Sequence, residues 1–185
     1  MMSDRIILDL CGGSGAWSAP YREAGYDIRV VDPVQRGGED VRLMLKPSCS
    51  IWGILCAPPC THLSGSGARW WAEKGDEALL EAMSVVDACL RIVSTNCPVW
   101  WALENPVGRL RRFLGSPRLL FDPCDYGDPW TKKTLLWGSF NLPVVRRVEP
   151  VEGSKMHLMG PSPERAALRS VTPAGFARAF FAANP

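Results

Sequence analysis

Short apolar runs separated by turn-forming residues recur along the chain and predict alternating strands and helices. The first run, residues 5–11, ends at a glycine cluster, as a buried parallel strand does before a tight turn. Further buried strands are expected at residues 26–31, 51–55, 99–103, 119–121 and 134–137. The strands at residues 26–31, 51–55 and 99–103 each end shortly before a proline, which has no N–H to donate to the hydrogen bonds of a sheet.

Helical periodicity is clearest over residues 76–95, where apolar residues recur every three or four positions. These positions are Leu79, Met83, Val86, Leu90 and Val93. The spacing predicts a helix that contributes packing and no chemistry. The segment between Pro143 and Arg169 contains several prolines and glycines without periodicity, so we expect it to be a loop.

Two shorter helices are indicated by residues that favour helix ends. After the first strand, Ser18 is a candidate N-cap, Pro20 is tolerated in the first turn, and Gly25 is suited to end the helix. Near the end of the chain, Thr172 is a candidate cap with Pro173 at the first helical position. The apolar face of this last helix consists of Phe176 and Phe180. The whole pattern predicts an α/β fold with a mostly parallel sheet flanked by helices.

Composition restricts the class of protein. With 185 residues the chain is long enough for one domain with a substantial core, and we expect residues 1–185 to form a single unit. Apolar residues make up 46% and charged residues 22%, and no apolar run approaches the roughly 18 residues of a membrane span. The first residues lack the form of a signal peptide, and seven cysteines without a pairing pattern suit a reducing compartment. A cytoplasmic protein without a membrane partner is expected.

The net charge of +2 neither identifies nor excludes a nucleic-acid partner, because dedicated binders carry a strong basic patch. Basic residues do gather locally, at residues 109–112, 132–133 and 146–147. Each cluster could contact phosphates, but a solvated surface is the simpler interpretation of any one of them.

Residues that often bind ligands or take part in catalysis lie at or just beyond the carboxyl ends of the predicted strands. They are Asp9, Gly12, Gly13, Asp32, Cys60 and Glu104. Because ligands bind at this edge of open parallel sheets, we expect an active site here. A glycine turn after the first strand lets the backbone approach a ligand, and a carboxylate after the second can bind ribose hydroxyls. The pattern predicts a nucleoside-bearing cofactor, although the glycine segment alone is also typical of a plain tight turn.

The order of these motifs over residues 6–138 resembles that of the C5-cytosine methyltransferase family. Asp9–Gly15 is similar to the family's cofactor loop, Pro58-Pro59-Cys60 with Ser64 to its catalytic loop, and Glu104-Asn105 to its Glu-Asn-Val motif. The short form, with Thr61-His62 after the cysteine, looks most like small methyltransferases of bacteriophages and prophages. The resemblance implies a Rossmann-like S-adenosylmethionine-dependent methyltransferase fold with S-adenosylmethionine as cofactor. The implied cofactor site consists of Asp9, Cys11, Gly12, Gly13, Ser14, Gly15, Asp32, Asp40, Val41 and Pro58.

The resemblance also implies a reaction, DNA (cytosine-5-)-methylation, and the residues that perform it. Cys60 would add as a thiolate to carbon 6 of cytosine, which makes carbon 5 nucleophilic enough to accept a methyl group. Glu104 would bind the nitrogen 3 and amino edge of the base and share a proton with it. Backbone amides of a loop that leads into a helix are expected to favour the thiolate. Lys132 and Lys133 are further catalytic candidates, and the substrate-binding candidates are Pro59, Ser64, Asn105 and Arg109.

Three departures from the family change what the resemblance implies. Residues 130–134 stand where the family has two arginines in a Gln-x-Arg-x-Arg motif, so lysine would replace a bidentate arginine contact. Pro106 replaces the usual valine, which puts the end of its strand in question. Residues 144–168 are expected to form a loop in place of the domain that reads DNA sequence, because no room for such a domain remains.

Because the domain that reads DNA sequence is missing, the resemblance does not identify the molecule that carries the target cytosine. DNA with little or short sequence preference is the first expectation, bound through the basic clusters with the cytosine turned out of the helix. A cytosine nucleotide or an RNA is the alternative carrier of the same base. A second copy of the chain or a partner subunit could supply the missing surface.

Other interpretations of the same residues stay open. Cys56, Cys60 and His62 lie close in sequence, but their spacing is not that of a standard zinc site and no metal site is predicted. Glu104 could instead be a structural carboxylate paired with an arginine. Four cysteines are expected in the core and four tryptophans in packing roles: Cys11, Cys49, Cys89 and Cys97, and Trp70, Trp71, Trp100 and Trp101. A catalytically silent protein of this fold that binds nucleic acid or another protein is the alternative from another class.

Overall fold

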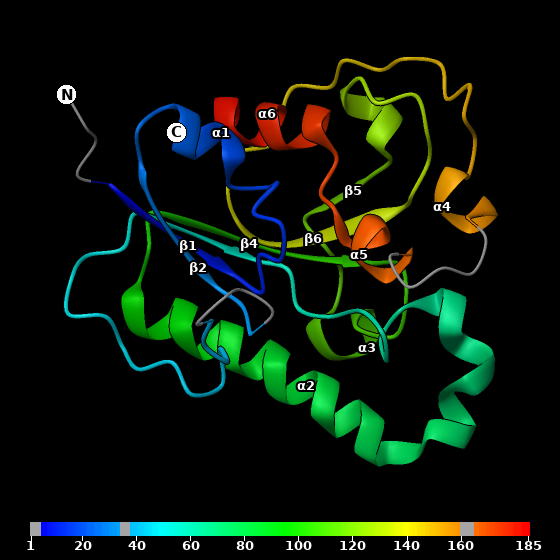
Figure 1. Cartoon of the computed structure of the whole chain (residues 1–185), viewed down its shortest axis with the longest axis horizontal. Coiled ribbons are helices and arrows are strands. Elements are labelled where there is room, and N and C mark those ends of the chain that lie inside the picture. The colour runs from blue at the N-terminus through cyan, green and yellow to red at the C-terminus, as the bar shows by residue number, and fades with distance from the viewer. Residues whose placement is uncertain (1–4, 34–37, 160–164) are drawn as a thin grey trace.

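The computed structural model describes residues 5–33, 38–159 and 165–185, which form a six-stranded sheet with helices on both faces (Figure 1). The strands are β1 (Ile6–Leu10), β2 (Asp27–Val31), β3 (Gly53–Cys56), β4 (Trp100–Pro106), β5 (Leu119–Phe121) and β6 (Thr134–Ser139). Their order across the sheet is β2-β1-β3-β4-β6-β5. β1 pairs in parallel with β2 and β3, and β3 with β4, whereas β6 is antiparallel to both of its neighbours. The predicted mostly parallel sheet flanked by helices is confirmed.

One long helix covers one face of the sheet, and two shorter helices cover the other (Figure 1). The helices are α1 (Ala19–Glu23), the 3-10 helix η1 (Gly65–Trp70), α2 (Trp71–Asn96), α3 (Arg111–Leu114), the 3-10 helix η2 (Pro123–Tyr126), α4 (Lys155–Leu158), α5 (Arg165–Ser170) and α6 (Ala174–Ala183). α2 is interrupted at Gly75, whose positive φ of 66° suits glycine, so its regular part corresponds to the predicted helix. Within the described ranges, no helix combines the length and apolar character needed to cross a membrane.

Two hydrophobic cores lie on opposite faces of the sheet. Leu8, Ile54 and Leu103 point toward α2 and pack with its buried face, which includes Val86 and Ile92. The neighbouring strand positions face the other way and pack against α1 and α6. This second core includes Ile7, Leu55, Trp100, Leu136, Tyr21, Phe176 and Phe180. Because both faces are covered, the central strands are mostly apolar, and their polar residues, Asp9 of β1 and Glu104 and Asn105 of β4, lie toward the carboxyl ends.

β4 is longer than predicted. The sequence indicated an end at residue 103, but Glu104, Asn105 and Pro106 continue the ladder and pair with Leu136, Leu135 and Thr134 of β6. An antiparallel neighbour far along the chain supplies these pairs, and proline is tolerated because it is the last residue of the strand. Glu104 is therefore held rigidly within a strand.

The predicted helix caps are only partly correct. Ser18 is the N-cap residue of α1, as predicted, but its hydroxyl donates a hydrogen bond to Asp9 and makes no capping bond to the helix. Pro173, and not Thr172, is the N-cap residue of α6. In both places a tertiary contact or proline geometry overrides the usual preference for a capping hydroxyl.

The expected loop between residues 143 and 169 is also only partly correct. α4 and the beginning of α5 lie in this range, while residues 160–164 lie outside the described residues. Cys97 is not the core residue that was expected, because it is exposed at the end of α2 in a left-handed conformation with φ of 47°.

Candidate active site

The turn between β1 and α1 brings a run of backbone to the carboxyl edge of the sheet. Gly13 and Gly15 have φ values of 51° and 68°, and Cys11 has φ of 57°, so the turn needs left-handed backbone at three positions. A Cβ on Gly12 would lie 2.5 Å from the Asp9 carboxyl carbon, whereas a Cβ on Gly13 would meet nothing within 4 Å. The turn is thus closed on the Asp9 side and open above Gly13.

Asp32 at the end of β2 fixes this turn. Its carboxylate accepts a hydrogen bond from the Gly13 backbone N–H at 2.9 Å, and the Cys11 N–H donates to the Val31 carbonyl at 2.8 Å. The sequence predicted Asp32 as a ribose ligand. The structure places it in contact with the glycine turn, within reach of the edge where a cofactor would lie.

Asp9 is completely buried below the turn. The Ser18 hydroxyl donates a hydrogen bond to one carboxylate oxygen, but the other oxygen, Oδ1, has no partner. Burial raises the pKa of Asp9 to about 6, although the Ser18 hydrogen bond and the nearby Arg22 oppose the rise. An orphaned acceptor next to an open glycine turn fits a cofactor that brings hydrogen-bond donors, as a nucleoside attached to an amino acid does.

Asp40 and Val41, two residues of the implied cofactor site, lie in a segment that α2 holds in place. Arg91 of α2 donates hydrogen bonds to the carbonyls of Met44, Val41 and Arg42 at 3.1, 3.4 and 3.2 Å. Val41 is buried in the core below, so its side chain supports the segment. The Asp40 carboxylate forms an ion pair with Arg42, which keeps the pKa of Asp40 below its usual value.

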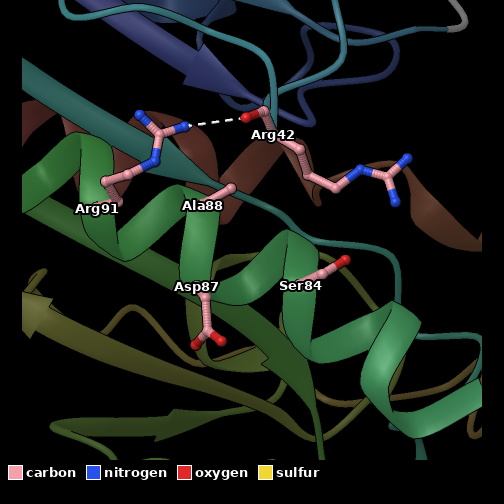
Figure 2. A pocket seen from close by; sticks show the side chains of 5 residues that line it. All are labelled: Arg42, Ser84, Asp87, Ala88 and Arg91. Carbon is pink, nitrogen blue, oxygen red and sulfur yellow. Dashed lines mark hydrogen bonds between the residues drawn. The ribbon is translucent and has the colours of Figure 1, made fainter. Parts of the chain in front are cut away.

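A hollow of about 480 Å³ lies beside this segment. It is lined by Arg42, Ser84, Asp87, Ala88 and Arg91, whose side chains are drawn in Figure 2. Both guanidinium groups already have partners, since Arg91 binds backbone carbonyls and Arg42 binds Asp40 and Glu81. The hollow therefore reflects how α2 supports the 40–44 segment. It does not contain the predicted catalytic residues.

The Cys60 turn follows β3 and is tied to the end of β4. The Leu63 and Ser64 N–H groups donate to the Cys60 carbonyl at 3.0 and 2.8 Å, which closes the turn. Asn105 donates from its buried side-chain amide to the Pro58 carbonyl at 2.9 Å. This bond joins the residue beside Glu104 to the segment that carries Cys60, so the two predicted catalytic residues lie on segments that contact each other.

The pKa of the Cys60 thiol is above its usual value. The side chain is exposed, yet the protein atoms around it desolvate the thiolate, and the Glu104 carboxylate adds to the rise. The positive charges of Lys132 and Arg169 act in the opposite direction. The expectation that backbone amides favour the thiolate is confirmed in part, because a backbone hydrogen bond at Cys60 lowers the thiol pKa. Burial outweighs this effect, and the Leu63 and Ser64 amides bind the Cys60 carbonyl instead, so the net shift of the pKa is upward.

Glu104 shares this environment. Desolvation raises its pKa, and Lys132 lowers it in part. In the described part of the chain it forms no ion pair with an arginine, so the structural interpretation of this carboxylate gains no support. A raised pKa favours the protonated form of this carboxyl group, and in that form the group can donate a hydrogen bond to a bound base.

The other predicted substrate and catalytic residues surround this turn in different roles. Arg109 is buried and donates to the His62 carbonyl at 2.7 Å, with its guanidinium 4.8 Å from the Trp71 ring centroid. Ser64 precedes η1 and accepts a hydrogen bond from the Ser66 N–H. Pro59 is exposed, and so is Lys133, whose carbonyl accepts a hydrogen bond from the Val107 N–H. Arg109 thus contacts the catalytic loop itself.

The structure bears on two other interpretations of the sequence, a metal site at the cysteines and packing roles for the tryptophans. Among the residues that the structure describes, no group of three or more His, Cys, Asp or Glu side chains could hold a metal ion. Cys56 is buried in the core with Cys89, away from solvent. Trp70 differs from the packing role expected for it, because it is exposed with Arg69 stacked 3.9 Å from its ring centroid.

Three residues of the site were missed in the sequence: Ser18, Arg91 and Arg169. Ser18 was noticed only as a cap, and Arg91 lies on a helix chosen for its apolar stripe. Arg169 lies in a segment expected to be irregular, and its carbonyl accepts a hydrogen bond from Lys132 at 2.8 Å. No local signal marks these residues, because their partners lie up to 50 positions away in the sequence.

Comparisons with known proteins agree with the fold. No protein-family model matches the chain, and no curated protein matches it. A solved structure that is similar is that of a candidate DNA modification methyltransferase encoded within a prophage of E. coli, with 20% sequence identity and a TM-score of 0.51. The match covers 79% of this chain and 53% of that one, so this chain spans about half the length of the protein it matches. The likeness shows the fold alone, which is Rossmann-like.

Proposed function

We propose that this protein is an S-adenosylmethionine-dependent methyltransferase that modifies carbon 5 of cytosine, with Cys60 as the nucleophile and Glu104 as the residue that binds the base. DNA is the proposed substrate. The observation that carries the proposal is the hydrogen bond from Asn105 to the Pro58 carbonyl, which joins the Cys60 turn to the strand end that carries Glu104. The motif resemblance and the fold of the prophage neighbour support the same conclusion.

The raised pKa of Glu104 suits its proposed role. A protonated carboxyl can donate to nitrogen 3 of cytosine, which draws electrons from the ring as the Cys60 thiolate forms a bond to carbon 6. Protonation of Glu104 also removes a negative charge that disfavours the thiolate. The two groups therefore assist each other when cytosine is bound, and Lys132 stabilises the negative charge on either one.

The glycine turn is the proposed cofactor site. Asp9, Gly12, Gly13 and Asp32 would hold S-adenosylmethionine, which supplies an electrophilic methyl group when bound. The unpaired Oδ1 of Asp9 and the open side of Gly13 support this assignment. The chain's task at this site is to orient the cofactor toward the Cys60 side and to exclude water from it.

The choice of DNA rests on the printed description of the prophage neighbour and on the basic residues near the site. Lys132, Lys133 and Arg169 lie on the β6 side of the Cys60 turn, where they can meet a phosphate backbone. A cytosine nucleotide or an RNA carries the same base and phosphate, so these remain the alternative substrates for the same chemistry.

Mass spectrometry of nucleosides tests the proposal. The purified full chain is incubated with S-adenosylmethionine and, separately, duplex DNA, single-stranded DNA, RNA or cytosine nucleotides. We expect 5-methylcytosine in the DNA samples and none with Cys60→Ala, whereas exchange of the exposed Cys97 for Ala leaves the yield unchanged. Product in the RNA or nucleotide sample alone would change the substrate, and absence of product in every sample despite cofactor binding would refute catalysis.

A further inference from the structure

A short antiparallel pairing joins the turn after Cys60 to the chain that follows β4. The Arg109 N–H donates a hydrogen bond to the Leu63 carbonyl at 2.9 Å. The Gly65 N–H donates to the Val107 carbonyl at 2.8 Å. Because Val107 directly follows the last residue of β4, these bonds tie the position of the turn to that strand.

Gly108 lets the two segments approach each other backbone to backbone. It forms an antiparallel bridge with Ser64. A Cβ at this position would lie 2.0 Å from the Leu63 carbonyl oxygen and 2.8 Å from the Gly65 nitrogen, so a larger residue would have to push the turn away. The separation between the turn and the end of β4 is therefore set by direct contact of the two backbones.

The side chain of Arg109 adds a third connection to the same turn. Its Nε donates to the His62 carbonyl at 2.7 Å, and its guanidinium lies 4.8 Å from the ring centroid of Trp71 at the start of α2. Only 9% of the residue is exposed, and its Nη2 atom is buried without an acceptor among the described residues. The guanidinium is thus enclosed by the turn and α2, where a substrate has little access to it.

The charge of Arg109 is not explained by an ion pair. Among the residues that the structure describes, the ion pairs involve other side chains, and a buried guanidinium without a carboxylate partner costs free energy. Stability by itself is a poor reason for such a residue. A guanidinium does, however, offer a planar group that binds a carbonyl and packs against an aromatic ring at once, which fixes the turn in one place.

We infer that Arg109 is a positioning residue, which holds the Cys60 turn at the distance from Glu104 that attack on a bound cytosine requires. The inference rests on the proposed function, because that distance matters only where the thiol and the carboxyl group act on one base. Arg109 is a substrate-binding candidate in the sequence, but its contacts lie with the turn and with α2. Misplacement of a reacting group by about 1 Å lowers a rate by about 10²-fold, so a residue that does not touch the substrate can control the rate.

Steady-state kinetics of methyl transfer by the full chain separates positioning from binding. We expect Arg109→Met, which keeps an unbranched side chain but has no donor, to lower kcat by about 10- to 100-fold. The affinities for S-adenosylmethionine and deoxycytidine monophosphate, measured by calorimetry, should change by less than about twofold. Arg118→Met is the matched control. Arg118 also donates from Nε to a carbonyl, that of Phe140, and lies 5.5 Å from its ring centroid, but it does so beside the beginning of β4 and not beside its end.

Amide hydrogen exchange, resolved by NMR spectroscopy, tests the connection without any substrate. The amides of residues 65 and 109 should exchange about tenfold faster in Arg109→Met, because the loss of a charge-assisted hydrogen bond lets the turn open more often. Gly108→Ala perturbs the same contact by size and leaves Arg109 in place, so we expect faster exchange and a lower kcat from it as well. Gly67→Ala is its control, since an added Cβ there would meet the Thr61 oxygen at an ordinary distance of 3.9 Å.

The results distinguish three failures. Weaker binding of deoxycytidine monophosphate with kcat retained would make Arg109 a substrate-binding residue and overturn the inference. Unchanged kcat in the folded Arg109→Met and Gly108→Ala variants, or unchanged exchange at residues 65 and 109, would also overturn it, while methylation by the wild type stands. If the wild type methylates no cytosine in any sample, the proposed function fails and the positioning role fails with it.

Discussion

The proposed cofactor side and the proposed nucleophile side of the candidate site lie at the same edge of the sheet but are held together differently. On the cofactor side, Asp9, Ser18 and Asp32 contact one another or the glycine turn within 24 residues of chain. On the nucleophile side, Cys60, Glu104, Lys132 and Arg169 come from four segments spread over more than a hundred residues. The first arrangement is local in sequence, and the second depends on the order of the strands.

This difference predicts how each side responds to mutation. Changes on the cofactor side should alter cofactor affinity and stability together, because the turn is part of the β1 core. Changes on the nucleophile side should alter catalysis more than cofactor affinity, because the contacts there join separate segments. Four variants test this comparison, from the largest expected effect to the smallest.

Glu104→Gln should produce the largest effect. The variant keeps the shape of the side chain but cannot supply a carboxyl proton, so we expect kcat to fall by about 10² to 10⁴-fold. Cofactor affinity, measured by calorimetry, should change by less than about twofold. Glu77→Gln on α2 is the matched control. A comparable loss of activity in both variants would show that the carboxyl group of Glu104 has no special role.

Asp9→Asn should change how stability depends on pH. Folded Asp9 binds its proton more tightly than the unfolded chain does, since its pKa rises from 3.8 to about 6. The free energy of unfolding should therefore fall by about 3 kcal/mol as pH rises through this range, with the loss complete above about pH 6. The variant should lack this fall. Urea unfolding between pH 4 and pH 8 measures it, with the exposed Asp87→Asn as control. Parallel curves for wild type and variant would contradict the prediction.

Asn105→Ala tests the link between the two catalytic segments. The buried amide donates to the Pro58 carbonyl, and its loss leaves that carbonyl unpaired, so we expect about 1 to 3 kcal/mol less free energy of unfolding. Methyl transfer at a temperature where the variant is folded should fall by about tenfold, with cofactor affinity retained. Asn96→Ala removes a similar bond to the Ile92 carbonyl on α2 and serves as control. Full activity of the folded Asn105→Ala variant would show that catalysis does not depend on this hydrogen bond.

Arg91→Gln should have the smallest effect. The variant loses hydrogen bonds to three carbonyls of the segment that carries Asp40 and Val41, and these bonds lie at or near the surface. We expect cofactor affinity to weaken by about two- to fivefold, corresponding to about 0.5 to 1 kcal/mol, with kcat unchanged at saturating cofactor. Arg29→Gln on the edge strand β2 is the control. A fall in kcat without a change in cofactor affinity would contradict this prediction, because it would show that Arg91 affects catalysis and not cofactor binding.

The sequence predicted the positions of all six strands and of the regular part of α2, because their apolar periodicity reflects burial on both faces of the sheet. It predicted less well where elements end. β4 extends to Pro106 because β6 pairs with it, and Ser18 turns from α1 toward Asp9 because a buried carboxylate needs a donor. In both of these cases a tertiary contact competes with a local preference.

The sequence by itself determined the alternation of elements, the glycine turn after β1 and the placement of polar residues at strand ends, since these follow from local periodicity and backbone geometry. Only the tertiary structure decided that Asn105 binds the Pro58 carbonyl, that Arg91 supports the 40–44 segment and that the charge of Arg169 lowers the pKa of Cys60. It also decided the direction of the Cys60 and Glu104 pKa shifts. Desolvation and charge depend on every atom within several ångströms, and those atoms come from segments that only folding brings together.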